Sequence, residues 1–580
     1  MKRPPLPSRR AIAAGLVVCL VLVGAWMTYQ LLHARSELEA ARADADDLRT
    51  ALADGRTPEV ERLAESLRVH AAAADGSLSG PHWWLAAHLP FVGDDIDAVR
   101  TITFGLNDVS TRNLPDLIDL YSEISGDAFR PVDGRIDTAA LRSARDRLAT
   151  SADGIASTSR SVAAIDTSGL IGPLRGPVGE VQRTLSDAAE ALRRASVAAD
   201  VLPDAVEGRH RYLLLFLNPA EIRAGGGMPG SWAELKVDDG RVSLGKQGAA
   251  ADEILESSPS ELTADELQFY NDRLGRDLRD VLFTPDFPRS AELARTLMER
   301  KRGLEVDGVL AMDAVTLAHL LNATGPVDLL DGTRITSANA AEELLNGVYL
   351  RTPNPKKQDA VFAAAVDTLF TRFTDGDLDP TETVRALVRS GEEHRVRAWF
   401  ADPALQARIA DTAVAGELPA TEAAPGYGIY FNDATGAKMQ YYLDVDARTD
   451  VSCGRDDTSV YTTDLTLTST APKNAASLPE AVVGPNPPTG PGGMVMQVDI
   501  VAPAGGSVPV IEQDGERPTY YSIRVDGRPG ARIIVALGPG DATTLRITSS
   551  AAPGVHADTA YEITPTVRSG RQPAPLYDPC

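Results

Sequence analysis

Residues 11–32 constrain this chain more than any other segment, because they form an apolar run without a charged side chain from Ala11 to Met27. A helix rises about 1.5 Å per residue, so the run would reach roughly the 30 Å thickness of a bilayer's hydrocarbon core. Basic residues precede the run and acidic residues follow it, namely Lys2, Arg3, Arg9 and Arg10, then Glu37, Asp44, Asp46 and Asp47. This bias predicts a single-pass protein of the cell membrane, with a cytoplasmic N-terminus and its bulk extracytoplasmic.

A cleaved signal peptide is the alternative interpretation of the same segment. Val23, Gly24 and Ala25 provide small residues of the kind found at a cleavage site. Trp26 and Tyr29 favour the uncleaved helix, since aromatic side chains anchor helices at membrane interfaces.

The acidic composition limits the choice of partner. The chain has 580 residues and a formal net charge of -24. A surface of that charge excludes nucleic acid as a partner. The cytoplasmic membrane remains as an expected partner, and an envelope polymer or lipid-linked sugar remains possible through a local basic patch.

Four regions are predicted from changes in the sequence pattern. Residues 1–33 form the cytoplasmic tail and transmembrane anchor, and residues 34–207 show the apolar spacing of a helical stalk or bundle. In residues 208–420 strand-like runs alternate with capped helices, which indicates an α/β core domain. Residues 425–580 carry short alternating runs between turns, which predicts a β-sandwich domain. The predicted fold class is a multidomain α+β protein with an N-terminal transmembrane helix.

Within the core, individual elements can be placed. The apolar run 211–218 predicts a strand buried on both faces, and the alternating segments on either side of the Asp-Asp-Gly turn at 238–240 predict a hairpin. Residues 306–312 predict another strand, followed by a helix capped by Asp313 and ended by Gly325. A further helix is expected to stop at Gly347.

One aromatic segment inside the helical region, residues 80–96, has two interpretations. It gathers Trp83, Trp84, Leu85, Leu89 and Phe91 in a dense apolar patch between polar helices. The patch is either an element that lies on a membrane surface or the core of a helical hairpin. The absence of accompanying basic residues favours the hairpin core.

Two nucleotide-binding signatures are rejected because of their surroundings. Residues 225–230 match G-x-G-x-x-G, but Pro229 and the alternating segment behind it predict a strand where a helix is required. Residues 240–246 have the spacing of a phosphate loop, but Gln247 replaces the hydroxyl residue that would hold magnesium. The sequence also contains no HExxH and no GxSxG, so zinc peptidase and serine hydrolase chemistry lack a candidate site, and no metal ligands are predicted.

Polar residues at the end of the first core strand form the remaining candidate site. Glycines after the strand allow close approach of the backbone to a ligand, and cations recur further along, where a helix begins. The candidate phosphate-binding residues are Asn218, Glu221, Arg223, Gly225, Gly226, Gly227, Arg351 and Lys357, with Lys356 beside them. The alternative is a tight glycine turn with a structural Arg-Glu pair.

The three cysteines allow one disulfide outside the apolar run. Cys19 lies within that run, which leaves Cys453 and Cys580 as a pair. A disulfide between them would fix the C-terminal end to the last domain. Two unpaired thiols are the alternative.

The stretch NPAEIRAGGGMPGSWAEL at 218–235 resembles the domain-of-unknown-function family 4012 of Gram-positive cell-envelope proteins. Segments that extend the resemblance are GPHWWLAAHLPFVGDDIDAVR, FTPDFPRSAELA, DGVLAMDAVTLAHLLNATGPV, RVRAWFADPALQ and GAKMQYYLDVDARTDVSC. The family has no established activity, so it implies an envelope role without a reaction.

The middle domain is similar, more distantly, to the LytR-CpsA-Psr phosphotransferases, which move glycopolymers from polyprenyl pyrophosphate carriers onto peptidoglycan. The similarity rests on RYLLLFLN, on VDGVLAMDAVTLAHLLNATGPVDL, and on YLR followed by KKQ. It implies that Arg223, Arg351 and Lys357 contact a pyrophosphate. The acid that helps those enzymes to hold magnesium is replaced here by Ala224, and their Pro-Arg-Asp motif is not recognisable.

These observations give three functional hypotheses. The first is a membrane-anchored envelope protein that binds a lipid-linked or wall glycopolymer through Arg223. The second is an active phosphotransferase with Mg²⁺ as its cofactor, which would recruit Glu221, Asp286 or Asp313 as the acid. The third is a non-catalytic envelope scaffold whose sandwich and stalk bind partner proteins.

Overall fold

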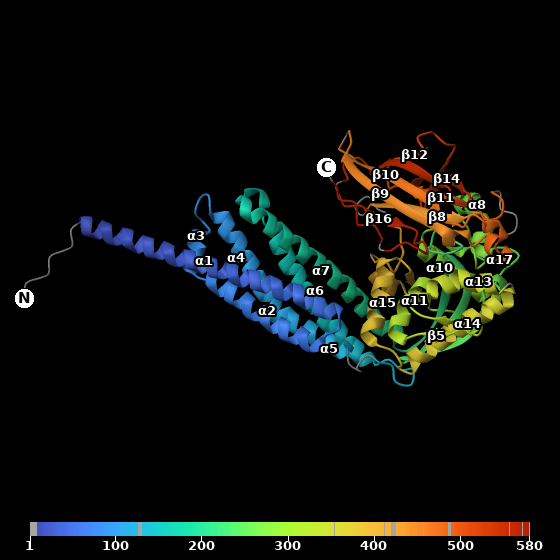
Figure 1. The fold of residues 1–580 in the computed structure, drawn as a ribbon, viewed down its shortest axis with the longest axis horizontal. Coiled ribbons are helices and arrows are strands. Elements are labelled where there is room, and N and C mark those ends of the chain that lie inside the picture. The colour runs from blue at the N-terminus through green and yellow to red at the C-terminus, as the bar shows by residue number, and fades with distance from the viewer. Residues whose placement is uncertain are drawn as a thin grey trace, which may run out of the picture. The chain divides into compact units, whose positions relative to one another are not determined.

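The computed structural model of the protein describes residues 9–125, 130–352, 354–410, 412–418, 425–455, 457–484, 489–555, 557–570, 572–578 and 580 (Figure 1). The chain divides into two compact units. One unit contains residues 1–129 and 139–200, and the other contains residues 130–138 and 201–580.

The first unit is helical. Its helices are α1 (Arg9–Ala53), α2 (Thr57–Leu78), α3 (Pro81–Ala86), α4 (Gly93–Asp108), the π-helical turn η1 (Val109–Asn113), α5 (Leu114–Ser125), α6 (Thr138–Ala163) and α7 (Gly172–Val206), the last of which runs on into the second unit. Helices α1 and α2 form a hairpin around Gly55, which adopts a φ of 70°. Ala41 and Leu48 of α1 pack with Val60 and Leu63 of α2. The predicted helical periodicity of this region is confirmed.

The predicted membrane anchor is wrong. Among the described residues, no helix is both long enough and apolar enough to cross a bilayer. Residues 11–32 belong to the 45-residue helix α1, and the polar residues Thr28 and Gln30 lie in the last part of this run. Gln30 is also used inside the protein, because its Oε1 accepts a hydrogen bond from Trp83 Nε1 at 3.2 Å. This finding contradicts the predicted single-pass topology, the predicted membrane localisation and the transmembrane part of the predicted fold class. Lys2 and Arg3, which supported that prediction, lie outside the described residues.

The second unit begins with a five-stranded sheet in the order β3-β2-β1-β4-β7. Its strands are β1 (Arg209–Asn218), β2 (Met228–Asp238), β3 (Arg241–Ala249), β4 (Gly308–Asp313) and β7 (Val396–Phe400). Only β1 and β4 run parallel, and the other neighbours are antiparallel. The buried strand, the hairpin and the helix between Asp313 and Gly325 are confirmed, whereas β7 was not among the predicted strands.

Helices surround this sheet. They are α8 (Ala264–Tyr270), α9 (Arg273–Arg276), α10 (Phe287–Arg302), α11 (Ala314–Thr324), α12 (Ala340–Glu342), α13 (Val348–Arg351), α14 (Pro355–Thr374), α15 (Pro380–Glu392) and α16 (Pro403–Ile409), with a small hairpin of β5 (Val327–Asp328) and β6 (Arg334–Ile335). Helix α10 packs on β1 and β4 through Leu293 and Leu297. The helix expected to stop at Gly347 continues through a π-helical turn into α13.

The C-terminal part is a sandwich of two sheets, in the orders β12-β15-β10-β9 and β13-β14-β11-β8-β16. Its elements are β8 (Gly426–Asp433), β9 (Leu443–Cys453), β10 (Ser459–Ser469), α17 (Glu480–Val483), β11 (Met494–Val501), β12 (Val510–Gln513), β13 (Tyr521–Val525), β14 (Arg528–Leu537), β15 (Ala542–Ser550) and β16 (Ala560–Ile563). Phe431 and Val498 from one sheet meet Leu465 and Ile547 from the other in one core.

The predicted disulfide is confirmed. Cys453 at the end of β9 is bonded to Cys580, and their Cα atoms lie 5.3 Å apart. The bridge holds the last residues of the chain against the edge of the sandwich.

Candidate functional site

The loop between β1 and β2, residues 219–227, carries most of the predicted ligand residues, and the structure buries it. Asn432 of β8 accepts a hydrogen bond from the Ala224 amide at 2.9 Å, and its Nδ2 donates to the carbonyl of Phe283 at 3.1 Å. The Thr564 hydroxyl donates to the carbonyl of Ala224 at 3.1 Å. The loop is therefore enclosed between the α/β sheet and the β-sandwich.

The three glycines serve this packing. A Cβ atom at Gly225 would collide with the side chain of Leu282, and one at Gly227 would lie 2.7 Å from the carbonyl carbon of Asn218. Gly226 adopts a φ of 116°, which disfavours other residues. The glycines let the loop approach its own chain, which is a structural use and needs no ligand.

Arg223 lies at the centre of the buried loop and has protein partners. Its Nη2 is 3.3 Å from Asp280 Oδ1, its Nη1 donates to the Ile222 carbonyl at 3.0 Å, and its guanidinium carbon lies 4.4 Å from the centre of the Phe283 ring. The residue is only 6% exposed. Its Nε has no hydrogen-bond partner among the described residues.

The acids beside Arg223 are shared with further arginines. Arg273 Nη2 lies 2.9 Å from Asp280 Oδ2, and Arg279 Nη2 lies 2.7 Å from Asp277 Oδ2. Burial raises the pKa of Asp280, although the charge of Arg223 counteracts it. Burial also opposes the ionisation of Asp277, but the hydrogen bonds from Arg279 outweigh it, so the pKa of Asp277 is lowered. Each carboxylate of this cluster therefore has at least one arginine within ion-pair distance.

Glu221 and Asn218 also have partners within the protein. Lys438 of the sandwich places its Nζ 2.6 Å from Glu221 Oε1 and 4.6 Å from the centre of the Tyr349 ring. Asn218 Nδ2 donates to the Tyr349 hydroxyl at 3.2 Å, while its Oδ1 accepts from the Ala220 amide at 3.0 Å. Sequence reasoning missed Tyr349 and Lys438, because neither carries a local signal of its role.

Arg351 and Lys357 are placed elsewhere. Arg351 lies 2.7 Å from Glu343 and donates to the Thr333 hydroxyl at 3.1 Å, beside the small β5-β6 hairpin. Tyr349, two residues earlier, faces the sandwich instead, because residues two apart on a helix point to different sides. Lys357 is exposed on the first turn of α14. No contact in the described part of the chain joins these two cations to Arg223.

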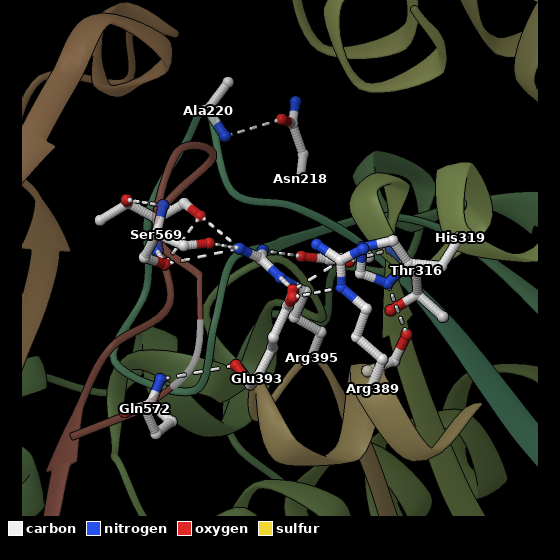
Figure 2. A network of polar contacts seen from close by, with 12 residues as sticks. Asn218, Ala220, Thr316, His319, Arg389, Glu393, Arg395, Ser569 and Gln572 are labelled. Atoms are coloured by element: carbon white, nitrogen blue, oxygen red, sulfur yellow. Dashed lines mark hydrogen bonds and ion pairs between the residues drawn. The ribbon is translucent and has the colours of Figure 1, made fainter. Parts of the chain in front are cut away.

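A second buried cluster lies where β4 ends (Figure 2). Arg395, whose side chain is fully buried, lies 2.7 Å from both Asp313 and Glu393 and donates to the carbonyls of Thr566 and Ser569 at 2.8 and 2.6 Å. Asp313 also caps α11 by accepting from the Thr316 amide at 2.8 Å.

The sandwich is fixed to the sheet by this second cluster too, since Thr566 and Ser569 follow β16. A surface pocket of about 520 Å³ adjoins the cluster, lined by Val384, Arg385, Val388, Arg389, Glu392, Glu393 and Gly570.

The three candidate catalytic acids cap helices or form ion pairs. Asp286 caps α10 by accepting from the Arg289 amide at 3.3 Å, and burial raises its pKa to about 6. Glu221 and Asp313 are ion-paired as described above. No group of three or more His, Cys, Asp or Glu side chains within the described ranges could hold a metal ion. The acids around Arg223 face arginines and lysine instead, so this set does not fit Mg²⁺.

Comparison with known proteins gives one match. Residues 207–349 match the family model described as "Protein of unknown function (DUF4012)". The resemblance to this family is confirmed over those residues. No curated protein and no solved structure matches the chain, so the similarity to the LytR-CpsA-Psr phosphotransferases has no support there.

Proposed function

We propose that this chain, which matches a family of unknown function over residues 207–349, is a non-catalytic scaffold whose β-sandwich and helical unit bind partner proteins. The observation that carries the proposal is the burial of the Arg223 loop between the α/β sheet and the sandwich. Arg223, Glu221 and Asn218 each have protein partners across or beside that junction. These contacts lie inside one compact unit that holds both the sheet and the sandwich.

The pairing of the cations near Arg223 with carboxylates supports a scaffold function over a pyrophosphate receptor. An anion site needs positive charge that the protein itself leaves uncompensated, or a metal ion that supplies it. Arg223 faces Asp280, Arg279 faces Asp277, and Lys438 faces Glu221. A pyrophosphate at this position would have to break ion pairs that are already buried.

Binding of a lipid-linked or wall glycopolymer through its phosphate is the second candidate. It is favoured by one observation, the buried Nε of Arg223, which has no acceptor among the described residues. A phosphate oxygen would satisfy it if the loop opened. Phosphotransfer needs in addition an acid or a metal, and Glu221, Asp286 and Asp313 are committed to pairs or caps.

One experiment separates the three hypotheses. The melting temperature and the release of inorganic phosphate are measured for the full chain with a polyprenyl pyrophosphate, with and without Mg²⁺. The scaffold predicts no shift in melting temperature and no release. A ligand that binds only the folded state would raise the melting temperature. A rise that is lost in Arg223→Lys, which keeps the charge beside Asp280 but removes Nε, and kept in Arg351→Ala, which leaves the buried junction intact, indicates a receptor. Phosphate release indicates the transferase.

A further inference from the structure

An exposed apolar surface lies on the connection between α3 and α4 in the helical unit. Five side chains form it, and we call them the tip patch: Trp84, Leu85, Leu89, Phe91 and Val92, with exposures of 56, 61, 55, 98 and 45%. Residues 82–92 contain no Asp, Glu, Lys or Arg. Contiguous exposed apolar side chains of this kind mark interaction sites.

The tip patch is held on a fixed base. Trp83, by contrast, is 2% exposed, and its Nε1 donates to the Ser77 carbonyl at 3.0 Å. His82 lies 3.0 Å from Gln30 Oε1 and packs against the ring of Trp26. Because Trp83 is anchored in the core, its neighbour Trp84 is directed to the outside.

A neighbouring apolar residue and the backbone of Phe91 add to the description of the tip patch. Ile171, which is 51% exposed, sits beside it, since its amide donates to Asp95 Oδ1 at 2.9 Å. Figure 1 shows α3 and the connection between α6 and α7 at the same end of the helical unit. Phe91 adopts a φ of 74°, an uncommon conformation for a residue other than glycine, and its ring is left almost wholly uncovered.

The size and charge of the patch identify the kind of partner. A stable protein interface takes about 800 Å² and 20–30 residues from each partner, and the five side chains of the tip patch fall short of it even with Ile171 added. A bilayer needs no matching shape, and tryptophan side chains prefer its interface. Asp94, Asp95 and Asp97 border the patch, so an anionic lipid surface is disfavoured.

We propose that the tip patch inserts into the interface of a lipid bilayer of low surface charge. The contact is peripheral: side chains enter one leaflet, and no helix crosses the membrane. It goes beyond the scaffold function, which concerns protein partners.

The test uses the full chain with vesicles of phosphatidylcholine, some of it brominated in the acyl chains to quench tryptophan fluorescence. Insertion predicts that brominated vesicles quench the wild-type protein and that Trp84→Phe loses a large part of that quenching. Trp399→Phe, which removes a buried tryptophan, is the matched control and keeps it. This difference reports on the Trp84 indole itself, whatever else in the chain touches the vesicle.

A second measurement tests the surface as a whole. The double variant Trp84→Ser with Phe91→Ser is expected to weaken co-sedimentation with the vesicles at least tenfold, whereas Phe104→Ser, another exposed aromatic of the same unit, leaves it unchanged. Circular dichroism checks that each variant keeps its helices. Equal quenching of wild type and Trp84→Phe overturns the proposal, as does a concentration-dependent dimer that the double variant abolishes, since the patch would then serve self-association.

Discussion

At the scale of single residues, the polar groups of the β1-β2 loop show how a candidate binding site can become a structural junction. Asn218, Glu221 and Arg223 stand out in the sequence because they follow a buried strand. Their partners are remote in sequence: Asp280 comes 57 residues after Arg223, and Lys438 lies in another sheet. Local pattern can therefore identify the polar side chains, but their burial depends on a sandwich that packs over them.

Loss of Arg223 should be costly. Arg223→Ala leaves Asp280 buried with Arg273 as its remaining close cation, and removing one partner of a buried ion pair costs about 3 kcal/mol. Arg351→Ala is the control, since the Arg351 side chain is 43% exposed and its ion pairs are worth below about 1 kcal/mol. Urea unfolding of both variants measures the difference. Equal losses would contradict the structural role of Arg223.

Asp286 should make stability depend on pH. Burial raises the pKa of Asp286 to about 6 in the folded protein, against about 3.9 in an unfolded chain. The folded state therefore holds a proton that the unfolded state has lost, and stability falls as the pH rises from about 4 to about 6. Asp286→Asn keeps an effective helix cap and cannot ionise.

The Asp286→Asn variant is expected to exceed the wild type by about 2 kcal/mol at pH 8 and to match it at pH 4. Urea unfolding at both pH values is the measurement. A gain of the same size at pH 4 and pH 8 would show that ionisation of Asp286 is not its source.

At the scale of elements, period and capping predict much of the chain. Alternation gives the hairpin of β2 and β3, and the caps Asp313, Asp379 and Asp402 mark where α11, α15 and α16 begin. The strand β7 was not predicted, because five residues beside a helix give little periodicity. The anchor over 11–32 was wrong because apolar content alone cannot foresee that Gln30 and Ala34 pack inside a helical unit.

The disulfide should stabilise the end of the sandwich. Cys453 and Cys580 close a loop with a sequence separation of 127 residues, and the segment before Cys580 otherwise rests on contacts such as the backbone pairing of Leu576 with Thr559. Cys580→Ser is expected to lower the free energy of unfolding by about 2–4 kcal/mol. Hydrogen exchange should increase first in residues 572–578. Unchanged exchange there would mean that the other contacts suffice.

At the scale of the whole molecule, the division into two units carries a thermodynamic consequence. The α/β sheet and the sandwich belong to one unit, joined by the Glu221–Lys438 ion pair and by hydrogen bonds from Arg395 to the segment after β16, whereas residues 1–129 and 139–200 form the other. The sequence predicts the sheet, the sandwich and the helical region as separate domains, and it contains no signal that buried polar contacts unite the first two.

Calorimetry should therefore resolve two unfolding transitions. Asp313→Asn, which removes a buried partner of Arg395, is expected to lower only the transition of the sheet and sandwich. Trp83→Ala, which opens the core near α3, should lower only the transition of the helical unit by about 3–5 kcal/mol. A single transition shifted by both variants would contradict independent units.

The carbonyls that receive the Arg395 guanidinium belong to Thr566 and Ser569, more than 170 residues further along the chain. A ribosome adds residues in order, so the strands of the sheet emerge long before that hydrogen-bonding site exists. Until Ser569 has left the exit tunnel, Arg395 can pair with Asp313 and Glu393 but lacks these two carbonyl acceptors, so the contact between the sheet and the segment after β16 cannot yet form. The hydrogen bonds that complete this end of the junction therefore become available late, as the chain is made.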